Sequence, residues 1–290
     1  MTNTTQQTID QRAMLIRLSI SQWTARKFDK QATYTTTTHY NAAKNSGRFS
    51  KVLVELAEIK KIARIVNDAR TYHYTITLPW GDDNSRILPS PLFSKYSAKM
   101  RQLETDFQNQ VSDFANQYST LIANAQNTLG GLFNSRDYPH PGQIKKYYKF
   151  KFDILPIQTA QDFRVNLDKS SVETIQKRIE DQMKQNIEAA VSETWKRLHS
   201  AIQHMSEKLG EKDAVFRDSL VGNIKELTDI LPDLNITNDP ALAETIETAR
   251  QELTKLNPDS LRRNPKEREE AKKKADDILS KMSGFTGKKQ

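Results

Sequence analysis

The 290-residue chain contains no cysteine. Disulfide bonds, thiolate nucleophiles and cysteine-ligated metal centres are therefore excluded. Only 9 glycines and 10 prolines are present, too few for a turn-rich β-sandwich or β-barrel. No apolar stretch approaches membrane-spanning length, and residues 1–11 lack the basic start and apolar centre of a signal peptide. We therefore expect a cytoplasmic protein, built mainly from helices and with no membrane partner.

Glycine and proline are also missing from the 37 residues between Leu92 and Gly130. Apolar positions in this stretch recur about every 3.67 residues, the period of a nearly straight amphipathic helix. A second stretch keeps nearly the same period. We predict long helices at residues 92–129 and 171–209. Their apolar stripes are Tyr96, Met100, Leu103, Phe107, Val111, Phe114, Tyr118, Leu121, Ala125 and Leu129, and Val172, Ile175, Ile179, Met183, Ile187, Val191, Trp195, Leu198, Ile202, Met205 and Leu209.

Several shorter segments are typical of strands, because apolar and polar residues alternate or β-branched and aromatic residues dominate. The threonine-rich segment 33–40 predicts a further strand or an ordered loop. Residues 52–66 carry a helical stripe with Ser50 placed to cap it. We predict an α+β fold, mainly α, in which long straight amphipathic helices pack together with a small antiparallel sheet. The predicted strands lie near residues 14–23, 72–78, 148–154 and 162–167.

The net charge of +8 is unevenly distributed along the chain. Residues 1–210 carry 29 basic and 20 acidic side chains, residues 211–261 carry 5 and 11, and residues 262–290 carry 10 and 5. We therefore expect an elongated α+β body at 1–210, an acidic helical segment at 211–261, and a basic charged helix and tail at 262–290. The basic tail has the charge to fold back onto the acidic segment, in the same molecule or in a neighbour.

The strongest functional signal is a cluster of lysines and aromatic residues between positions 145 and 152. Lysines bind phosphates and aromatic rings stack on bases, the two contacts that single-stranded nucleic acid needs. The alternative is an edge strand whose rings turn into the core while its lysines point outward and prevent aggregation. The alternation of Phe150 and Phe152 with lysines favours the edge strand. The candidate nucleic-acid-binding residues are Lys145, Lys146, Tyr147, Tyr148, Lys149 and Lys151.

The basic tail is a second candidate site for an anionic partner. Interleaved glutamates oppose that function, because Glu269 and Glu270 lie four residues before Lys273 and Lys274 in the favourable order for helical ion pairs. A self-stabilised, solvated helix is the alternative. The candidate residues are Arg262, Arg263, Lys266, Arg268, Lys272, Lys273 and Lys274.

No set of residues in the sequence has the spacing of a catalytic or metal-binding site. His199 and His204 lie about 140° apart around a helix, so they do not share one metal ion. Asp82 and Asp83 lack the remaining ligands of a cation-binding loop. Phosphate-binding glycine loops and nucleophile elbows are missing from the sequence. We predict a protein without catalytic residues, cofactor or metal; the remaining histidines, His39, His73 and His140, are isolated.

A series of short signatures runs through residues 13–210. They are Trp23 with Arg26-Lys27-Phe28-Asp29, the long helix with Phe107, Phe114 and Tyr118, the Tyr138-Pro139 turn, and Ile154-Leu155-Pro156-Ile157 followed by Asp162-Phe163-Arg164-Val165. Their order resembles a phage- and mobile-element-borne family of uncharacterised proteins, a domain of unknown function. Its members are often encoded beside a MoxR-type AAA ATPase and a von Willebrand A-like protein. The resemblance implies a phage accessory protein in the bacterial host cytoplasm with such an ATPase as partner, and no catalytic residues.

Two functions follow as hypotheses from these observations. The first is a non-enzymatic accessory protein that assembles with itself, or binds another phage or host protein, through its long helices. The alternative is an accessory protein of phage replication or recombination that binds single- or double-stranded nucleic acid. The regular stripes favour the first, and the basic body with its lysine–aromatic cluster favours the second.

Overall fold

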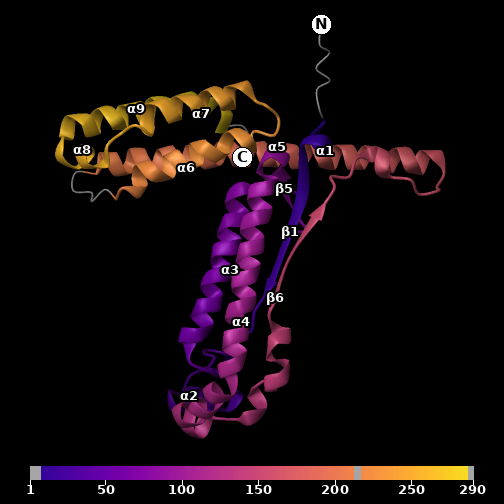
Figure 1. Cartoon of the computed structure of the whole chain (residues 1–290), viewed down its shortest axis with the longest axis vertical. Coiled ribbons are helices and arrows are strands. Elements are labelled where there is room, and N and C mark those ends of the chain that lie inside the picture. The colour runs from indigo at the N-terminus through magenta and orange to yellow at the C-terminus, as the bar shows by residue number, and fades with distance from the viewer. Residues whose placement is uncertain (1–7, 212–216, 287–290) are drawn as a thin grey trace. The chain divides into compact units, whose positions relative to one another are not determined.

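The computed structural model describes residues 8–211 and 217–286, apart from the side chains of Leu56, Phe285 and Thr286. It has the mainly α, α+β fold that the sequence predicts (Figure 1). The helices are α1 Ile9–Arg12, α2 Lys30–His39, α3 Leu56–Ile76, α4 Phe93–Leu129, α5 Lys169–Gly210, α6 Ser219–Leu234, α7 Pro240–Leu253, α8 Pro258–Arg263 and α9 Pro265–Thr286. The strands are β1 Ala13–Ser21, β2 Arg26–Phe28, β3 Ser50–Val52, β4 Leu78–Pro79, β5 Arg86–Pro89 and β6 Lys149–Leu155.

The chain divides into two compact units, each assembled from separate stretches of sequence. Unit 1 comprises Met1–Arg17, Tyr74–Ser94 and Asp153–Gln290, and unit 2 comprises Leu18–His73 and Lys95–Phe152. This division differs from the segments expected from charge, because residues 153–210 share unit 1 with both C-terminal segments.

Unit 2 is built around α3 and α4, which run alongside each other (Figure 1). The stripe of α4 is buried from Tyr96 to Ala125, as its period predicts. Tyr96 stacks on Tyr72 of α3 and its hydroxyl lies 2.9 Å from Nδ1 of the buried His73. Gly130 ends α4 with a positive φ of 49°, a conformation that glycine adopts without a steric cost. The first long helix is thus confirmed.

The threonine-rich segment of unit 2 is a helix, α2, rather than a strand or loop. The Asp29 side chain caps it by accepting a hydrogen bond of 2.9 Å from the backbone N–H of Ala32. The hydroxyls of Thr33, Thr36 and Thr37 donate to the carbonyls four residues earlier. Threonine otherwise favours extended backbone. The Asp29 cap and these local hydrogen bonds outweigh that preference, so the segment is helical.

The predicted strand at residues 72–78 is wrong over most of its length, because α3 continues to Ile76. Ile62, Val66, Ala69, His73 and Ile76 are all buried, and their spacing is that of one helix face. This stripe outweighs the β-branched and aromatic composition, and only Leu78–Pro79 forms a strand.

Two other local predictions are also corrected. Ser50 is not a helix cap, because Ser50–Val52 forms β3, paired with Arg26–Phe28 of β2, and the helix begins later. Residues 162–167 hold no strand: Ala160–Asp162 is a 3₁₀ turn, and Val165 and Leu167 are 56% and 46% exposed. Apolar and polar residues therefore alternate in residues 162–167 although the described part of the chain provides neither a paired strand nor a core for their apolar side chains.

The strands outside the β2–β3 pair form one sheet in the order β4-β5-β1-β6. Within unit 1, β1 pairs antiparallel with β5 from Ala13 opposite Pro89 to Ile16 opposite Arg86. β6 lies at one edge of this sheet. The strands predicted near 14–23 and 148–154 are therefore present as β1 and β6.

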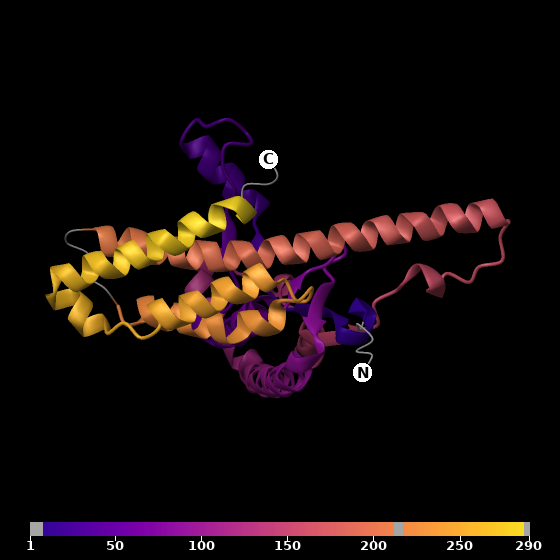
Figure 2. The same cartoon turned by 90° about the horizontal axis from the view of Figure 1, so that it is seen from above.

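The helices of unit 1 bury only part of α5. Asp168, rather than a following serine, caps α5 by accepting a hydrogen bond from Ser171 N–H. From Trp195 to Leu209 its stripe is buried, and α6 and α9 pack on it. Figure 2 shows α9 lying along this second half of α5, while the first half extends beyond the other helices of the unit. The stripe residues of that first half, Val172, Ile175, Ile179, Met183 and Ile187, are only partly buried.

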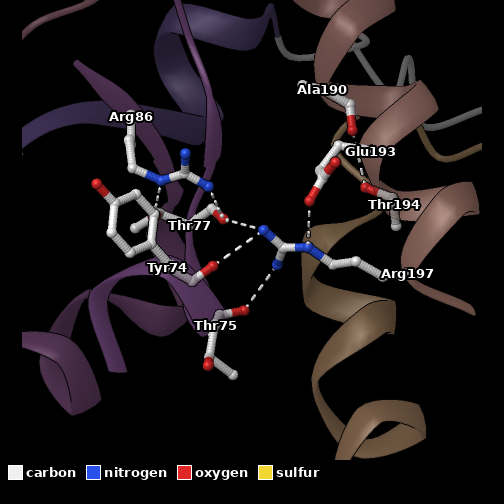
Figure 3. A network of polar contacts seen from close by, with 8 residues as sticks. All are labelled: Tyr74, Thr75, Thr77, Arg86, Ala190, Glu193, Thr194 and Arg197. Carbon is white, nitrogen blue, oxygen red and sulfur yellow. Dashed lines mark hydrogen bonds and ion pairs between the residues drawn. The ribbon is translucent and has the colours of Figure 1, made fainter. Parts of the chain in front are cut away.

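Arg197 of α5 binds the C-terminal end of α3 within unit 1. Figure 3 shows its guanidinium donating to the carbonyl oxygens of Tyr74, Thr75 and Thr77, at 2.8–2.9 Å. Its Nε pairs with the Glu193 carboxylate at 3.0 Å. One planar side chain thereby satisfies carbonyls that the end of a helix leaves without partners.

We predict that Met205→Ala destabilises the protein by about 2–5 kcal/mol, because it opens a cavity at a fully buried position. Met183→Ala, on the partly exposed half of the same stripe, will cost no more than about 1 kcal/mol. Urea unfolding followed by circular dichroism measures both. Equal costs would contradict the division of α5 into a buried and a partly exposed half.

We predict that Arg197→Lys lowers the free energy of unfolding by about 1–3 kcal/mol, because a lysine ammonium cannot reach three carbonyls and one carboxylate in a plane. Arg178→Lys on the same helix, where the side chain is exposed, is the matched control and will change little. Thermal unfolding of the two variants compares them directly. A loss no larger than that of the control would show that the carbonyl contacts do not stabilise unit 1.

Candidate nucleic-acid interface

The net charge of the chain resides in unit 2. Its two stretches contain 18 basic and 8 acidic side chains, a net charge of +10, whereas unit 1 contains 26 basic and 28 acidic side chains, a net charge of −2. Attraction for a polyanion depends on the local field rather than on the total charge of the chain. Unit 2 is therefore the part of the molecule suited to a phosphate-rich partner.

The lysine–aromatic cluster predicted from the sequence lies in unit 2 but is split between two elements. Lys145, Lys146 and Tyr147 belong to the 3₁₀ segment Pro141–Tyr147, and Lys149 and Lys151 belong to β6. The four lysines are exposed, and Tyr147 is 48% exposed. These five side chains are accessible to a partner, as the prediction requires.

The prediction that Tyr148 contacts nucleic acid is wrong, because its ring is not available for stacking. It is 7% exposed and contacts Phe107 and Phe114, with ring centroids 6.3 and 5.8 Å apart. Phe150 packs on Phe107 at 5.6 Å. In the edge strand β6 the rings therefore point into the core and the lysines point outward. This arrangement matches the alternative interpretation, in which the lysines protect the sheet edge. This surface offers cations and one ring.

The basic tail lies in unit 1 and turns its cations toward carboxylates. Arg262 pairs with Asp218 and, at 2.6 Å, with Asp259. Lys274 lies 2.7 Å from Glu252, and Lys272 lies 2.5 Å from Asp276 within α9. The first three carboxylates belong to the acidic segment, so the tail folds back onto it. The other candidate residues are Arg263, Lys266 and Lys273, which are exposed, and Arg268, which is partly buried.

A buried lysine holds three segments of unit 2 together. The Lys51 ammonium of β3 lies 2.7 Å from a carboxylate oxygen of Asp137 and 3.0 Å from one of Asp29, and it donates to the Leu132 carbonyl at 2.8 Å. Burial alone would lower the pKa of Lys51, but the two carboxylates raise it above its usual value. The hydrogen bond from Ala32 N–H, and then Lys51, lower the pKa of Asp29. Lys51 and Asp29 therefore form an ion pair at neutral pH.

A groove of about 720 Å³ lies beside this cluster, between α2 and residues 131–135. Its walls offer two aromatic rings, Phe49 and Phe133, and hydrogen-bonding side chains, notably those of Gln31, Thr35, Thr36, Asn134 and Ser135. No motif in the sequence predicted this groove. The available signal was the composition of residues 26–50, with five basic residues and a single carboxylate.

Exposed rings gather in the same part of unit 2. Tyr34, Tyr40 and Phe49 are 64%, 73% and 37% exposed, and with Tyr147 they are the large apolar side chains exposed in the described part of unit 2. α2 buries no residue. The core therefore does not account for these rings. The basic residues of the same segment are Arg26, Lys27, Lys30, Lys44 and Arg48.

A second groove, of about 580 Å³, lies in unit 1 between the partly exposed half of α5 and the turn after Trp80. Ile179 and Met183 form its apolar side, and Arg17 pairs with Asp83 on the other. Hydrogen bonds from Ser85 and the Arg17 cation lower the pKa of Asp83. The charges of this groove compensate each other, so it favours no ligand of one sign.

Within residues 8–211 and 217–286, no three His, Asp or Glu side chains converge as the ligands of a metal ion would. None of the helices in these ranges combines the length and the apolar character needed to cross a membrane.

Comparison with known proteins returned no match: no protein-family model fits this chain, and no curated protein or solved structure is significantly similar to it. The likeness to a phage-borne family therefore stays a prediction from the short signatures alone.

We predict that Lys51→Met destabilises unit 2 at neutral pH, because it leaves two carboxylates facing each other without their cation. The lowered pKa of Asp29 means that its stabilising contribution is complete above the unfolded value of about 3.9 and is lost as the pH falls through the folded value. The stability difference between wild type and variant will therefore shrink below about pH 4. Urea unfolding at a series of pH values measures this difference, and a pH-independent difference would contradict the assignment.

Proposed function

We propose that this chain is a non-enzymatic interaction protein whose unit 2 binds nucleic acid. The observation that carries the proposal is the segregation of charge, +10 on unit 2 against −2 on unit 1. Phosphate contacts supply most of the affinity of nucleic-acid-binding proteins, through release of condensed counterions. A unit with this excess of cations attracts nucleic acid wherever its surface lysines and arginines are solvated.

The charged side chains of unit 2 support this proposal further. Asp29 and Asp137, two of its 8 acidic residues, neutralise the buried Lys51 instead of opposing a ligand at the surface. Lys145, Lys146, Lys149 and the other cations of that surface are exposed. The positive field therefore faces outward while the compensating carboxylates are partly inside.

Self-assembly, the other function expected from the sequence, is the second candidate. Val172, Ile175, Ile179 and Met183 continue the stripe of α5 where unit 1 covers it only in part. The occupant would be a second copy, because an identical stripe has the same period and the two can lie along each other. Light scattering after size exclusion decides: a dimer lost in Ile179→Glu supports self-assembly, and a monomer removes it. A phage origin and an ATPase partner stay predictions from the resemblance.

We predict that the full chain binds a single-stranded oligonucleotide of about 30 nucleotides and that its affinity falls about 100-fold between about 50 and 200 mM salt, as about five phosphate contacts would require. The double charge reversal Lys149→Glu with Lys151→Glu will lower affinity roughly tenfold and flatten the salt dependence. Fluorescence anisotropy measures both quantities.

The matched control is Lys266→Glu with Lys273→Glu, which makes the same change in total charge on exposed positions of unit 1. Affinity will change little, because these cations lie outside the positive unit. An equal loss in both double variants would mean that total charge matters rather than unit 2. Failure to bind at low salt would remove the proposal.

A further inference from the structure

We propose that the groove between α2 and residues 131–135 binds unpaired nucleotides, with the Phe49 ring as a stacking surface, so that unit 2 prefers single strands to duplexes. This inference rests on the proposed nucleic-acid binding and adds to it the site and the form of the ligand. It concerns a surface separate from the lysines of 145–151.

The groove has the size and chemistry of a nucleotide site. Its volume of about 720 Å³ falls within the roughly 300–1,000 Å³ of small-ligand pockets. Thr35 and Thr36 of α2 line one wall, and Asn134 and Ser135 line the other. Hydroxyls and amides of this kind match the hydrogen-bonding edges of bases. The groove thus offers polar partners to a base together with aromatic rings, of which Phe49 is the exposed one.

Phe49 is held by its backbone, which leaves its ring free for another role. Its N–H donates to the Thr33 hydroxyl at 2.9 Å, and its carbonyl accepts from Asp29 N–H at 3.0 Å. The ring itself is 37% exposed and lines the groove. An aromatic side chain fixed at the mouth of a polar groove is the arrangement that stacks on an unpaired base.

Cations of the same segment would hold the phosphates on either side of such a base. Arg48 precedes Phe49 and lies over the Phe28 ring, 4.7 Å from its centroid. Arg26, Lys27 and Lys30 follow along β2 and the start of α2. The only carboxylate between residues 26 and 50 is Asp29, which binds Lys51 and caps α2. The repulsion that would oppose a phosphate is therefore small.

These features select a single strand over a duplex. In a duplex the bases stack on each other and their faces are covered, so an exposed protein ring gains nothing from them. A duplex would meet the cations alone, and its affinity would be set by the phosphates. The ring and the polar walls add affinity only when a base is free to enter.

The test compares Phe49→Ala with Tyr40→Ala in the full chain. Both remove an exposed ring from unit 2, and only Phe49 lines the groove. The probes are an oligothymidylate and a duplex DNA, each of about 12 nucleotides per strand, titrated by fluorescence anisotropy at low salt. Circular dichroism checks that each variant is folded, and the backbone contacts of residue 49 do not depend on its ring.

We expect Phe49→Ala to weaken binding of the single strand about tenfold and to leave the duplex unchanged, whereas Tyr40→Ala changes neither. Phe49→Trp, which keeps a stacking ring, will retain single-strand binding. Equal weakening of both probes by Phe49→Ala, or weakening by Tyr40→Ala alone, overturns the groove assignment and leaves nucleic-acid binding by unit 2 in place. If neither probe binds wild type at low salt, the proposed function fails and the groove assignment fails with it.

Discussion

Unit 2 depends on one buried ammonium group. Removing a lysine charge from water is costly, and Lys51 offsets this cost with two carboxylates and one carbonyl within 3.0 Å. Because the partners come from positions 29, 132 and 137, this lysine brings together β3, the start of α2 and the segment after α4. The same contact sets the surface chemistry of the unit, since it draws two of its few carboxylates inside and leaves the other cations facing solvent.

The two units differ in how far their basic side chains are compensated by carboxylates. In unit 1 the basic tail is largely compensated, with Arg262 on Asp218 and Asp259 and Lys274 on Glu252. Exposed pairs of this kind add little stability, but they cancel the field that a partner would feel. Unit 2 has more than twice as many basic as acidic side chains, so its field is not cancelled. A polyanion would therefore be attracted to one part of this chain and not to the other.

The long helices were predictable because periodicity is a local property. The stripe of α4 repeats over 37 residues without a breaker, and it is buried almost throughout. Composition was a poorer guide where a cap or a stripe opposed it, as in α2, where Asp29 starts a helix in a run of threonines. The groove was beyond sequence reasoning for a different reason. It lies beside the cluster of Asp29, Lys51 and Asp137, which spans more than 100 residues of the sequence. The spacing of such distant residues does not predict that they meet.

Residues 145–151 and residues 26–50 have similar compositions, but their local structures expose different side chains. Both segments combine cations with aromatic rings. β6 follows an alternating pattern at a sheet edge, so Phe150 is buried against Phe107 and the lysines face solvent. The segment around α2 has no such alternation and buries no ring of its helix, so Tyr34 and Phe49 stay exposed among cations. Exposed rings carry a risk of aggregation, which the surrounding positive charge reduces. A surface that keeps rings at that cost, beside a polar groove, is better explained by a ligand with flat faces and negative charge than by the packing of the fold.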